Sequence, residues 1–210
     1  MADDKKYLRK ILRECRSALP RAYVASASGA VQRRLMASAA YRDADAVVLY
    51  AAKDNEIATG ELLAGVLASG RLALMPKVVL DSHDLRLIRV NDPSELAPGA
   101  FGLLEPTGAE IVPLAGLVRA LICVPGVAFS PVGQRLGRGG GYYDRMLAAT
   151  GPQVITAGLA YSFQLLDRLP ESPNDRRLNL IVTESAMHAA GDAPHPGTLR
   201  ADQGGVPRCW

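Results

Sequence analysis

The sequence has few aromatic residues, few cysteines and no long hydrophobic run. Aromatic residues make up 5% of the 210 residues, and there are three cysteines. Cys15, Cys123 and Cys209 are far apart and lack CxxC spacing, so neither a disulfide framework nor a cysteine-based zinc site is indicated. No stretch approaches the roughly 18 apolar residues of a membrane-spanning helix, and the charged N-terminus does not resemble a secretory signal. We therefore expect a cytoplasmic protein that does not bind membranes.

Charge of one sign is also scarce. The formal net charge is +3, from 24 Lys and Arg against 21 Asp and Glu. This balance does not indicate a nucleic-acid partner. Small-molecule substrates are the expected partners, and we expect the protein to be a monomer or weak homodimer. The hydrophobic content of 49% is ordinary for a globular protein, and the length suits a single domain.

Segments with strand and helix periodicity alternate along the chain. Helices are predicted over residues 3–19, 21–40, 56–69 and 142–150. Strands are predicted over residues 46–50, 71–75, 85–90, 121–124, 154–160 and 178–183, the second of them ended by Pro76. The alternation predicts a single-domain, three-layer Rossmann-like α/β fold, with a mostly parallel sheet and helices on both faces. We assign residues 1–188 to this domain and residues 189–210 to a loosely ordered Pro/Gly-rich tail.

One glycine-rich segment stands out, Gly133 to Arg145, with the sequence GQRLGRGGGYYDR. It follows the predicted strand 121–124 and leads into the predicted helix 142–150. Glycines allow backbone amides to approach a ligand closely, and Arg135 and Arg138 offer paired donors for phosphate oxygens. No Lys-Ser/Thr follows the glycines, so this is not a Walker A loop. The segment indicates either a phosphate-binding loop or a flexible loop without a ligand.

The helix predicted over 3–19 has a basic face formed by Lys5, Lys6, Arg9, Lys10, Arg13 and Arg16. Such a face is typical of a solvated surface. Asp144 either favours the helix dipole or holds Mg²⁺ beside phosphates. Glu56 by itself is typical of a first-turn acid of its helix, and a lone Phe101 in a loop is typical of a side chain that fills the core.

Several motifs in the same order resemble the 5-formyltetrahydrofolate cyclo-ligase (methenyltetrahydrofolate synthetase) family. The most selective is PGVAFSPVGQRLGRGGGYYDR, which contains the glycine loop. The others are KKYLR at 5–9, NEIAT at 55–59, MPK at 75–77, FGLLEP at 101–106 and LNLIVTE at 178–184. The resemblance covers roughly residues 3 to 188. It implies an enzyme that uses ATP to convert 5-formyltetrahydrofolate to 5,10-methenyltetrahydrofolate, releasing ADP and phosphate.

The resemblance also implies roles for individual residues. ATP and its phosphates would be bound by Lys5, Arg9, Arg135, Gly137, Arg138, Gly139, Gly140, Gly141 and Tyr143. Folate would be bound by Tyr50, Glu56, Thr59, Phe101 and Tyr142. Arg138, Tyr143 and Asp144 would act in catalysis, and Asp144 and Asn179 would hold Mg²⁺.

The chain departs from the family pattern at three positions. Ser130 stands where an acid is usual, Asn179 where an aspartate is common, and Asn174 where a histidine is often found. An amide oxygen can ligate Mg²⁺ but brings no charge. A non-catalytic or divergent paralogue that binds nucleotide or folate is therefore an alternative. An unrelated sugar-phosphate or coenzyme A-binding protein is another, although the NEIAT motif argues against it.

Overall fold

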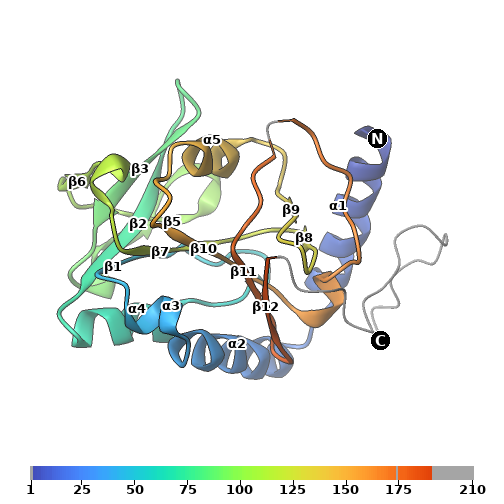
Figure 1. Cartoon of the computed structure of the whole chain (residues 1–210), viewed down its shortest axis with the longest axis horizontal. Helices are drawn as coiled ribbons and strands as arrows, with labels where there is room; N and C mark the ends of the chain where they lie inside the picture. The colour runs from blue at the N-terminus through green and yellow to red at the C-terminus, as the bar shows by residue number, and fades with distance from the viewer. Residues whose placement is uncertain (1, 174, 191–210) are drawn as a thin grey trace.

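An eight-stranded sheet forms the centre of the protein, whose structure is a computed structural model describing residues 2–173 and 175–190 (Figure 1). The strand order is β12-β11-β10-β7-β1-β2-β3-β6. The five strands from β11 to β2 are parallel to one another, and β12, β3 and β6 are antiparallel to their neighbours. The strand bounds are β1 Ala46–Val48, β2 Leu72–Val79, β3 Asp84–Arg89, β6 Ile111–Val112, β7 Ala120–Val124, β10 Ile155–Leu159, β11 Leu180–Val182 and β12 Met187–Ala189. The predicted mostly parallel sheet is confirmed.

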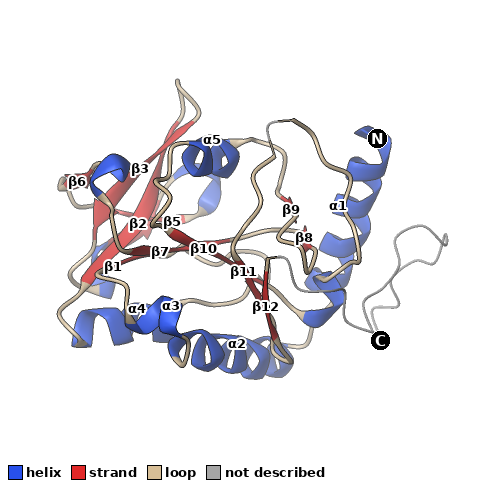
Figure 2. Cartoon of the chain, in the orientation of Figure 1, coloured by secondary structure: helices blue, strands red, loops and turns tan. Residues whose placement is uncertain are grey.

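The two faces of this sheet bury separate hydrophobic clusters. Val47 and Leu121 face the cluster beneath α2 (Arg21–Met36) and α4 (Gly60–Ala68). Their neighbours Val48 and Ile122 face the opposite cluster, which includes side chains of α5 (Tyr142–Ala148). Successive residues of a strand point to opposite faces, so apolar runs such as Ala120–Val124 serve both clusters. Figures 1 and 2 show the helices on the two sides, which confirms the three-layer arrangement.

Helix α1 (Ala2–Ser17) packs on a small hairpin at one end of the sheet (Figure 2). The hairpin consists of β8 (Ala128–Phe129) and β9 (Arg135–Leu136). Leu12 of α1 is fully buried in a third cluster with Val127, Ala128 and Leu136. This packing brings the N-terminal residues of the chain next to the glycine loop, which follows β9.

Two predicted helices have different bounds in the structure. The helix predicted over 21–40 ends at Met36, and the short α3 (Ala39–Arg42) begins after Ser38, whose side chain accepts from the amide of Tyr41. The helix predicted from Glu56 begins only at Gly60, with Thr59 as its N-cap. Asp54 and Asn55, just before Glu56, adopt positive φ angles of 53° and 56°. Glu56 therefore precedes the helix, and its interpretation as a first-turn acid is wrong.

Strand β2 continues through Pro76, where the sequence predicted its end. Pairing with β1 reaches only Leu74, whereas pairing with β3 continues to Val79. Proline is tolerated in a strand where one side lacks a pairing neighbour. The longer β2 and β3 form a hairpin that extends to the candidate site.

The segment between β3 and β7 and the one after β10 contain short elements. They are the strand pair β4 (Leu96–Pro98) and β5 (Leu104–Pro106), and the 3₁₀ turns η1 Pro93–Glu95, η2 Ala100–Gly102, η3 Leu114–Gly116 and η4 Ser162–Gln164. At the other end of the chain, β12 includes Ala189, and the amide of Ala190 donates to Asn179, so regular pairing passes the predicted domain boundary at 188. The rest of the predicted tail lies outside the described residues. Among the helices that are described, none has both the length and the apolar character needed to cross a membrane.

Candidate active site

The glycine loop connects β9 to α5 at the carboxyl end of β7. Contrary to the predicted strand–loop–helix order, the β8–β9 hairpin intervenes between β7 and the run of glycines. Gly139 and Gly141 have φ angles of 107° and 70°, a region that other residues rarely adopt. The sequence therefore needs glycine at these positions to turn the backbone from β9 into α5.

A cavity of about 350 Å³ lies on one side of this loop, and we call it the aromatic pocket. Its walls combine apolar and aromatic side chains with a few charged groups. It is lined by Lys53, Glu56, Val78, Leu85, Phe101, Leu103, Pro125, Gly126, Arg135, Gly137, Arg138, Gly139, Gly140, Gly141, Tyr142, Tyr143 and Asp144. Such a pocket suits a planar organic ligand with a limited number of polar groups.

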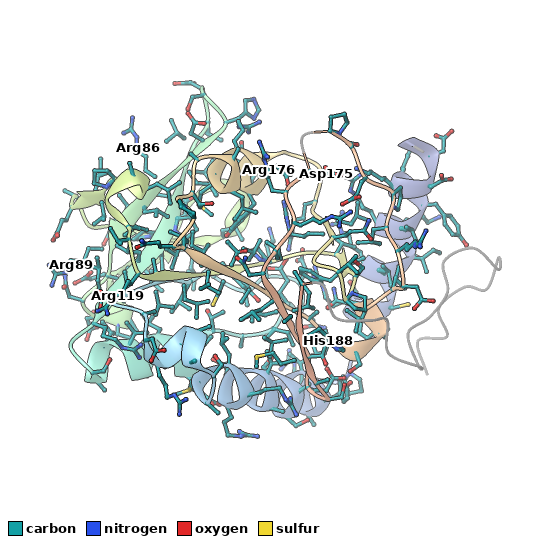
Figure 3. The ribbon with its side chains drawn as sticks, in the orientation of Figure 1. Arg86, Arg89, Arg119, Asp175, Arg176 and His188 are labelled. Carbon is teal, nitrogen blue, oxygen red and sulfur yellow. The ribbon has the colours of Figure 1, made fainter. Side chains whose placement is uncertain are left out.

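A second cavity of about 460 Å³ lies on the other side of the loop, and we call it the basic pocket. It is lined by Lys5, Arg9, Arg135, Leu136, Gly137, Gly139, Gly141, Asp144, Arg145, Ala148, Ser172, Asp175 and Arg176. Figure 3 labels Asp175 and Arg176 in this region, near α5. Both pockets share Arg135, Asp144 and three loop glycines. Ligands in the two pockets would therefore meet at these residues.

The basic residues of the second pocket are held by specific contacts. Lys5 forms an ion pair with Asp175 (2.6 Å), and the Nε of Arg9 donates to the carbonyl of Gly137 (2.8 Å). Arg135 is buried and donates to Asp144 at 2.7 Å, while its Nε atom has no hydrogen-bond partner. A buried donor without a hydrogen-bond partner lowers the stability of the folded protein, because it has lost its hydrogen bonds to water. The structure brings Lys5, Arg9 and Arg135 to this pocket, whereas the other phosphate-binding candidates Arg138, Gly140 and Tyr143 line the aromatic pocket.

In the aromatic pocket, Glu56 is 7% exposed and lies between two arginines. Its Oε1 is 3.0 Å from Nη2 of Arg138 and 3.6 Å from Nη1 of Arg16. Arg138 also contacts Asp54 at 3.1 Å. Burial alone would lower the pKa of Arg138, but the charges of Glu56 and Asp54 raise its pKa overall.

The prediction missed Arg16, which was counted with the basic face of its helix. Arg16 is 1% exposed and lies on the buried side of α1 with Leu12 and Cys15, and Leu19, just beyond the helix, is buried as well. These residues are spaced at i, i+3, i+4 and i+7, so the helical periodicity contained the signal. An arginine in the middle of an apolar stripe indicates a buried partner.

Tyr142 lies at the rim of the aromatic pocket within a cluster of ring contacts. Its ring centroid is 6.1 Å from that of Phe101, edge to face, and 5.5 Å from that of His83. The guanidinium of Arg145 lies 5.5 Å from the same ring. Phe101 is 59% exposed, so its interpretation as a core residue is wrong. Tyr143 also lines the pocket, where burial, followed by the charge of Glu56, raises the pKa of its phenol.

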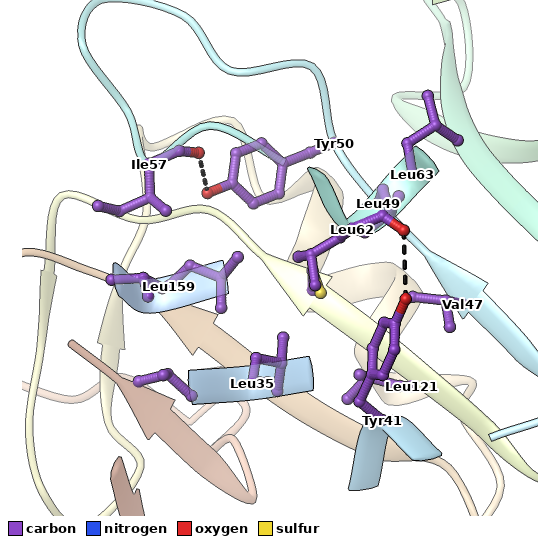
Figure 4. Packing of buried hydrophobic residues seen from close by; sticks show 14 of the residues in the cluster. Leu35, Tyr41, Val47, Leu49, Tyr50, Ile57, Leu62, Leu63, Leu121 and Leu159 are labelled. Atoms are coloured by element: carbon purple, nitrogen blue, oxygen red, sulfur yellow. Dashed lines mark hydrogen bonds between the residues drawn. The ribbon is translucent and has the colours of Figure 1, made fainter. Parts of the chain in front are cut away.

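Two residues predicted to contact folate do not line the pocket. Tyr50 is 2% exposed and its hydroxyl donates to the carbonyl of Ile57 at 2.8 Å (Figure 4). Thr59 is also buried, and its hydroxyl donates to the carbonyl of Tyr50 at 2.7 Å. Both side chains instead secure the backbone of the segment that carries Glu56. The predicted direct contacts of Tyr50 and Thr59 with folate need correction for this reason.

Asn179 is not near Asp144, and the predicted pairing of the two at a metal is wrong. Its side-chain oxygen accepts from the amide and the hydroxyl of Thr156, both at 2.8 Å. It lines a third cavity with Arg119 and Ile155, where β7, β10 and β11 begin. The glycine loop lies where β7 ends. Figure 3 shows Arg119 far from Asp175 and Arg176 of the basic pocket.

Of the two predicted metal ligands, Asp144 is the one that lies beside the glycine loop. In the described part of the chain, no group of three or more His, Cys, Asp or Glu side chains is arranged to hold a metal ion. Mg²⁺ does not need such a cage, because it is often bound by one or two carboxylates together with substrate phosphates and water. Asp144 lines both pockets and is 24% exposed, with Oδ1 contacting Arg135. The site fits Mg²⁺ carried by a nucleotide.

Comparison with known proteins identifies the family to which the chain is similar. Residues 1–184 match the 5-formyltetrahydrofolate cyclo-ligase family. A 5-formyltetrahydrofolate cyclo-ligase of Escherichia coli K12 is 30% identical over 148 residues, which cover 69% of this chain and 80% of that protein. A mitochondrial protein of the same name from Arabidopsis thaliana is 29% identical over 155 residues, 63% of this chain and 56% of the plant protein. The NMR structure of Aquifex aeolicus 5,10-methenyltetrahydrofolate synthetase has a TM-score of 0.78 and 34% identity, covering 91% of this chain and 95% of that one.

Proposed function

Because the chain belongs to the 5-formyltetrahydrofolate cyclo-ligase family, we propose that it catalyses the ATP-dependent conversion of 5-formyltetrahydrofolate to 5,10-methenyltetrahydrofolate. The observation that supports this most is the pair of adjoining pockets. One is aromatic and the other basic, and they share Arg135, Asp144 and the loop glycines. A reaction between a folate and a nucleotide needs both ligands to meet at one place.

The reaction consists of two displacements. The formyl oxygen attacks the γ-phosphorus of ATP, which forms an O–P bond and breaks the bond to ADP. N10 of the folate then attacks the formyl carbon and loses its proton, the C–O bond breaks, and phosphate leaves. Phosphorylation is required because the formamide oxygen by itself is a poor leaving group. The protein contributes positioning and charge neutralisation, as is usual in phosphoryl transfer.

The residues of the two pockets divide these tasks. Lys5, Arg9 and Arg135 bind the phosphates in the basic pocket, and the loop amides approach the transferred group. Glu56, Phe101 and Tyr142 orient the folate in the aromatic pocket. Arg138 and Tyr143, which line the aromatic pocket beside the shared glycines, act on the phosphorylated formyl group. Asp144 would hold Mg²⁺ together with phosphate oxygens, and the ion would neutralise part of their charge.

The substitutions that motivated a non-catalytic alternative lie outside both pockets wherever they are described. Ser130 is fully buried in the turn of the β8–β9 hairpin, where its hydroxyl accepts from the amide of Gln134. Asn179 lies at the opposite end of the strands. Neither side chain is placed to contact a ligand of the glycine loop. We therefore favour a catalytic protein, which we expect to act in the cytoplasm as a monomer or weak homodimer.

The proposal is tested by following the absorbance of the methenyl product with 5-formyltetrahydrofolate and MgATP. ADP and phosphate should appear in equal amounts with the product, and omission of ATP should abolish it. Folate and nucleotide binding without product would instead select the non-catalytic paralogue. Binding of neither ligand would contradict both.

A further inference from the structure

Arg16 is the most deeply buried charge next to the candidate site, and nothing described above gives it a task. It is 1% exposed, and its Nε and Nη2 atoms have no hydrogen-bond partners. Its Nη1 donates to the carbonyl of Gly126 at 3.2 Å and lies 3.6 Å from Glu56. Burial lowers the pKa of this guanidinium, and the charge of Glu56 opposes that effect. Removing either member of a buried ion pair is strongly destabilising, because the other charge is left buried without compensation.

The two arginines that contact Glu56 differ in their freedom to move. Arg16 is enclosed by α1 and the wall of the aromatic pocket, and its side chain is 2% exposed. Arg138 is carried by the glycine loop, and its side chain is 38% exposed. Arg138 therefore can exchange partners without rearranging the core, whereas Arg16 cannot.

Nucleotide phosphate would compete for Arg138. In the structure its guanidinium contacts Glu56 and Asp54, both carboxylates. A phosphate offers more charge and a geometry that matches the guanidinium fork. When Arg138 turns to a phosphate, Glu56 loses its closest cation while remaining in a buried wall.

We propose that Arg16 is a positioning residue for Glu56, remaining with this carboxylate when Arg138 leaves it for nucleotide phosphate. Arg16 thereby holds the Glu56 side chain in place and directed at the folate in the loaded enzyme. This inference depends on the proposed function, because it assumes that folate and nucleotide occupy the two pockets. In this inference Arg16 stays in contact with Glu56 throughout, and Arg138 contacts Glu56 only until nucleotide binds.

The test compares Arg16→Met, Arg16→Lys and a matched control, Arg13→Met, from the exposed side of the same helix. In Arg16→Met, the KM for 5-formyltetrahydrofolate should rise on the order of tenfold while the KM for ATP changes little. The acidic limb of its pH–rate profile should shift upward by about one pH unit, because an uncompensated buried carboxylate protonates more readily. Arg16→Lys should largely restore the profile, and Arg13→Met should match the wild type.

The pH–rate profile also depends on the other charged and titratable groups near Glu56. The Arg16 variants leave these groups unchanged. These groups are Arg138 and Asp54, and the phenols of Tyr50, Tyr143 and Tyr161. If Arg16→Met does not fold, Arg16→Gln removes the charge while keeping a donor for the Gly126 carbonyl. A wild-type profile and folate KM in the neutral variant that folds would overturn the inference. The inference would also be overturned if the KM for ATP and the KM for 5-formyltetrahydrofolate rose equally and Arg16→Lys did not restore them.

A double-mutant cycle on the free energy of unfolding tests the coupling of Arg16 and Glu56 without using enzymatic activity. Failure of the inference can therefore be told apart from failure of the proposed function. Glu56→Gln should be less destabilising in the Arg16→Met background than in the wild type, because each partner removed alone leaves the other charge buried. Independent effects of the two substitutions would refute the positioning role, even if the wild type forms methenyl product. Absence of product in the wild type, with clear coupling between the two residues, would count against the proposed function alone.

Discussion

The charged residues of the two pockets are paired with one another. Arg135 contacts Asp144 in the wall shared by both pockets, and Arg138 contacts Glu56. These pairs hold the side chains in place before a ligand binds. Their energetic value depends on burial, because water and salt screen an exposed pair far more than a buried one.

Asp144→Asn tests the buried pair. The substitution keeps the shape of the side chain but leaves Arg135, which is 4% exposed in its side chain, without a charged partner. We expect the free energy of unfolding to fall by on the order of 1.5–3 kcal/mol, toward the lower end because Asp144 is itself 24% exposed. Urea denaturation measures this loss. Asp45→Asn removes an equivalent aspartate from the fully exposed pair with Arg119 and should change stability little; equal effects of the two variants would contradict the argument.

Phe101→Ala tests the aromatic wall. Phe101 is mostly exposed and contacts Tyr142, so its removal creates no core cavity. We expect unchanged melting temperature and a KM for 5-formyltetrahydrofolate that rises several-fold, corresponding to roughly 0.5–1.5 kcal/mol of lost ring contact. Leu104→Ala removes a nearby exposed side chain that does not line the pocket and serves as the control. A similar KM in both variants would show that the ring does not contact the folate.

At the scale of elements, the glycine-rich segment 133–145 places two different constraints on its backbone, one in the β8–β9 turn and one in the glycine loop. Gly133, in the turn of the β8–β9 hairpin, has a φ angle of 83°, and a Cβ there would lie 2.2 Å from the carbonyl oxygen of Leu178. Gly139 has a φ angle of 107°, but a Cβ there would be no closer than 3.7 Å to any other group. Gly133 is therefore required for close packing against Leu178, whereas Gly139 is required for the backbone conformation of the loop.

Alanine substitutions should separate these constraints. Gly133→Ala should lower stability strongly, because the backbone of Leu178 cannot yield. Gly139→Ala should impose backbone strain of about 1–3 kcal/mol, which the loop can relieve by shifting, so ATP affinity should fall more than melting temperature. Calorimetry with ATP and thermal unfolding measure the two effects. Gly116→Ala, where a Cβ would meet nothing within 4 Å, is the neutral control; loss of stability without loss of ATP affinity in Gly139→Ala would contradict the assignment of the loop.

At the scale of the whole molecule, the two ends of the parallel strands have different roles. Both ligand pockets lie at the end where β7 finishes, as is general for open α/β sheets. Asn179 lies at the end where β10 and β11 begin, and there its side chain joins the two strands through Thr156. The sheet itself separates Asn179 from any ion bound at Asp144.

Asn179→Asp should therefore leave the Mg²⁺ dependence of methenyl formation unchanged. The new carboxylate can still accept from Thr156, and it is too remote to bind an ion held by nucleotide phosphates. Titration of activity with Mg²⁺ should give superimposable curves for this variant and the wild type. Asp144→Asn should need more Mg²⁺ for half-maximal turnover. A lower Mg²⁺ requirement in Asn179→Asp would place that residue in the metal site after all.

The sequence by itself determined the order and type of the main elements, and it indicated the glycine-rich segment as the candidate site. The short apolar run Ala120–Val124, ended by Pro125-Gly126, favours a buried strand, and the glycines at 139 and 141 allow the positive φ angles that the loop adopts there. These signals are local, because they depend on periodicity and on the conformations that each residue type allows. The motif order was selective enough to indicate the family.

Only the tertiary structure decided which side chains meet. The spacing of Asp144 and Asn179 carries no information about the end of the sheet at which each lies, and the prediction paired them wrongly. Arg16 resembled its basic neighbours in sequence, yet the packing of α1 on the β8–β9 hairpin buries it against Glu56. Tyr50 and Thr59 belong to the right segments, but their hydroxyls turn inward to the backbone. Contacts between residues far apart in the chain depend on how whole elements pack, and local sequence does not encode that packing residue by residue.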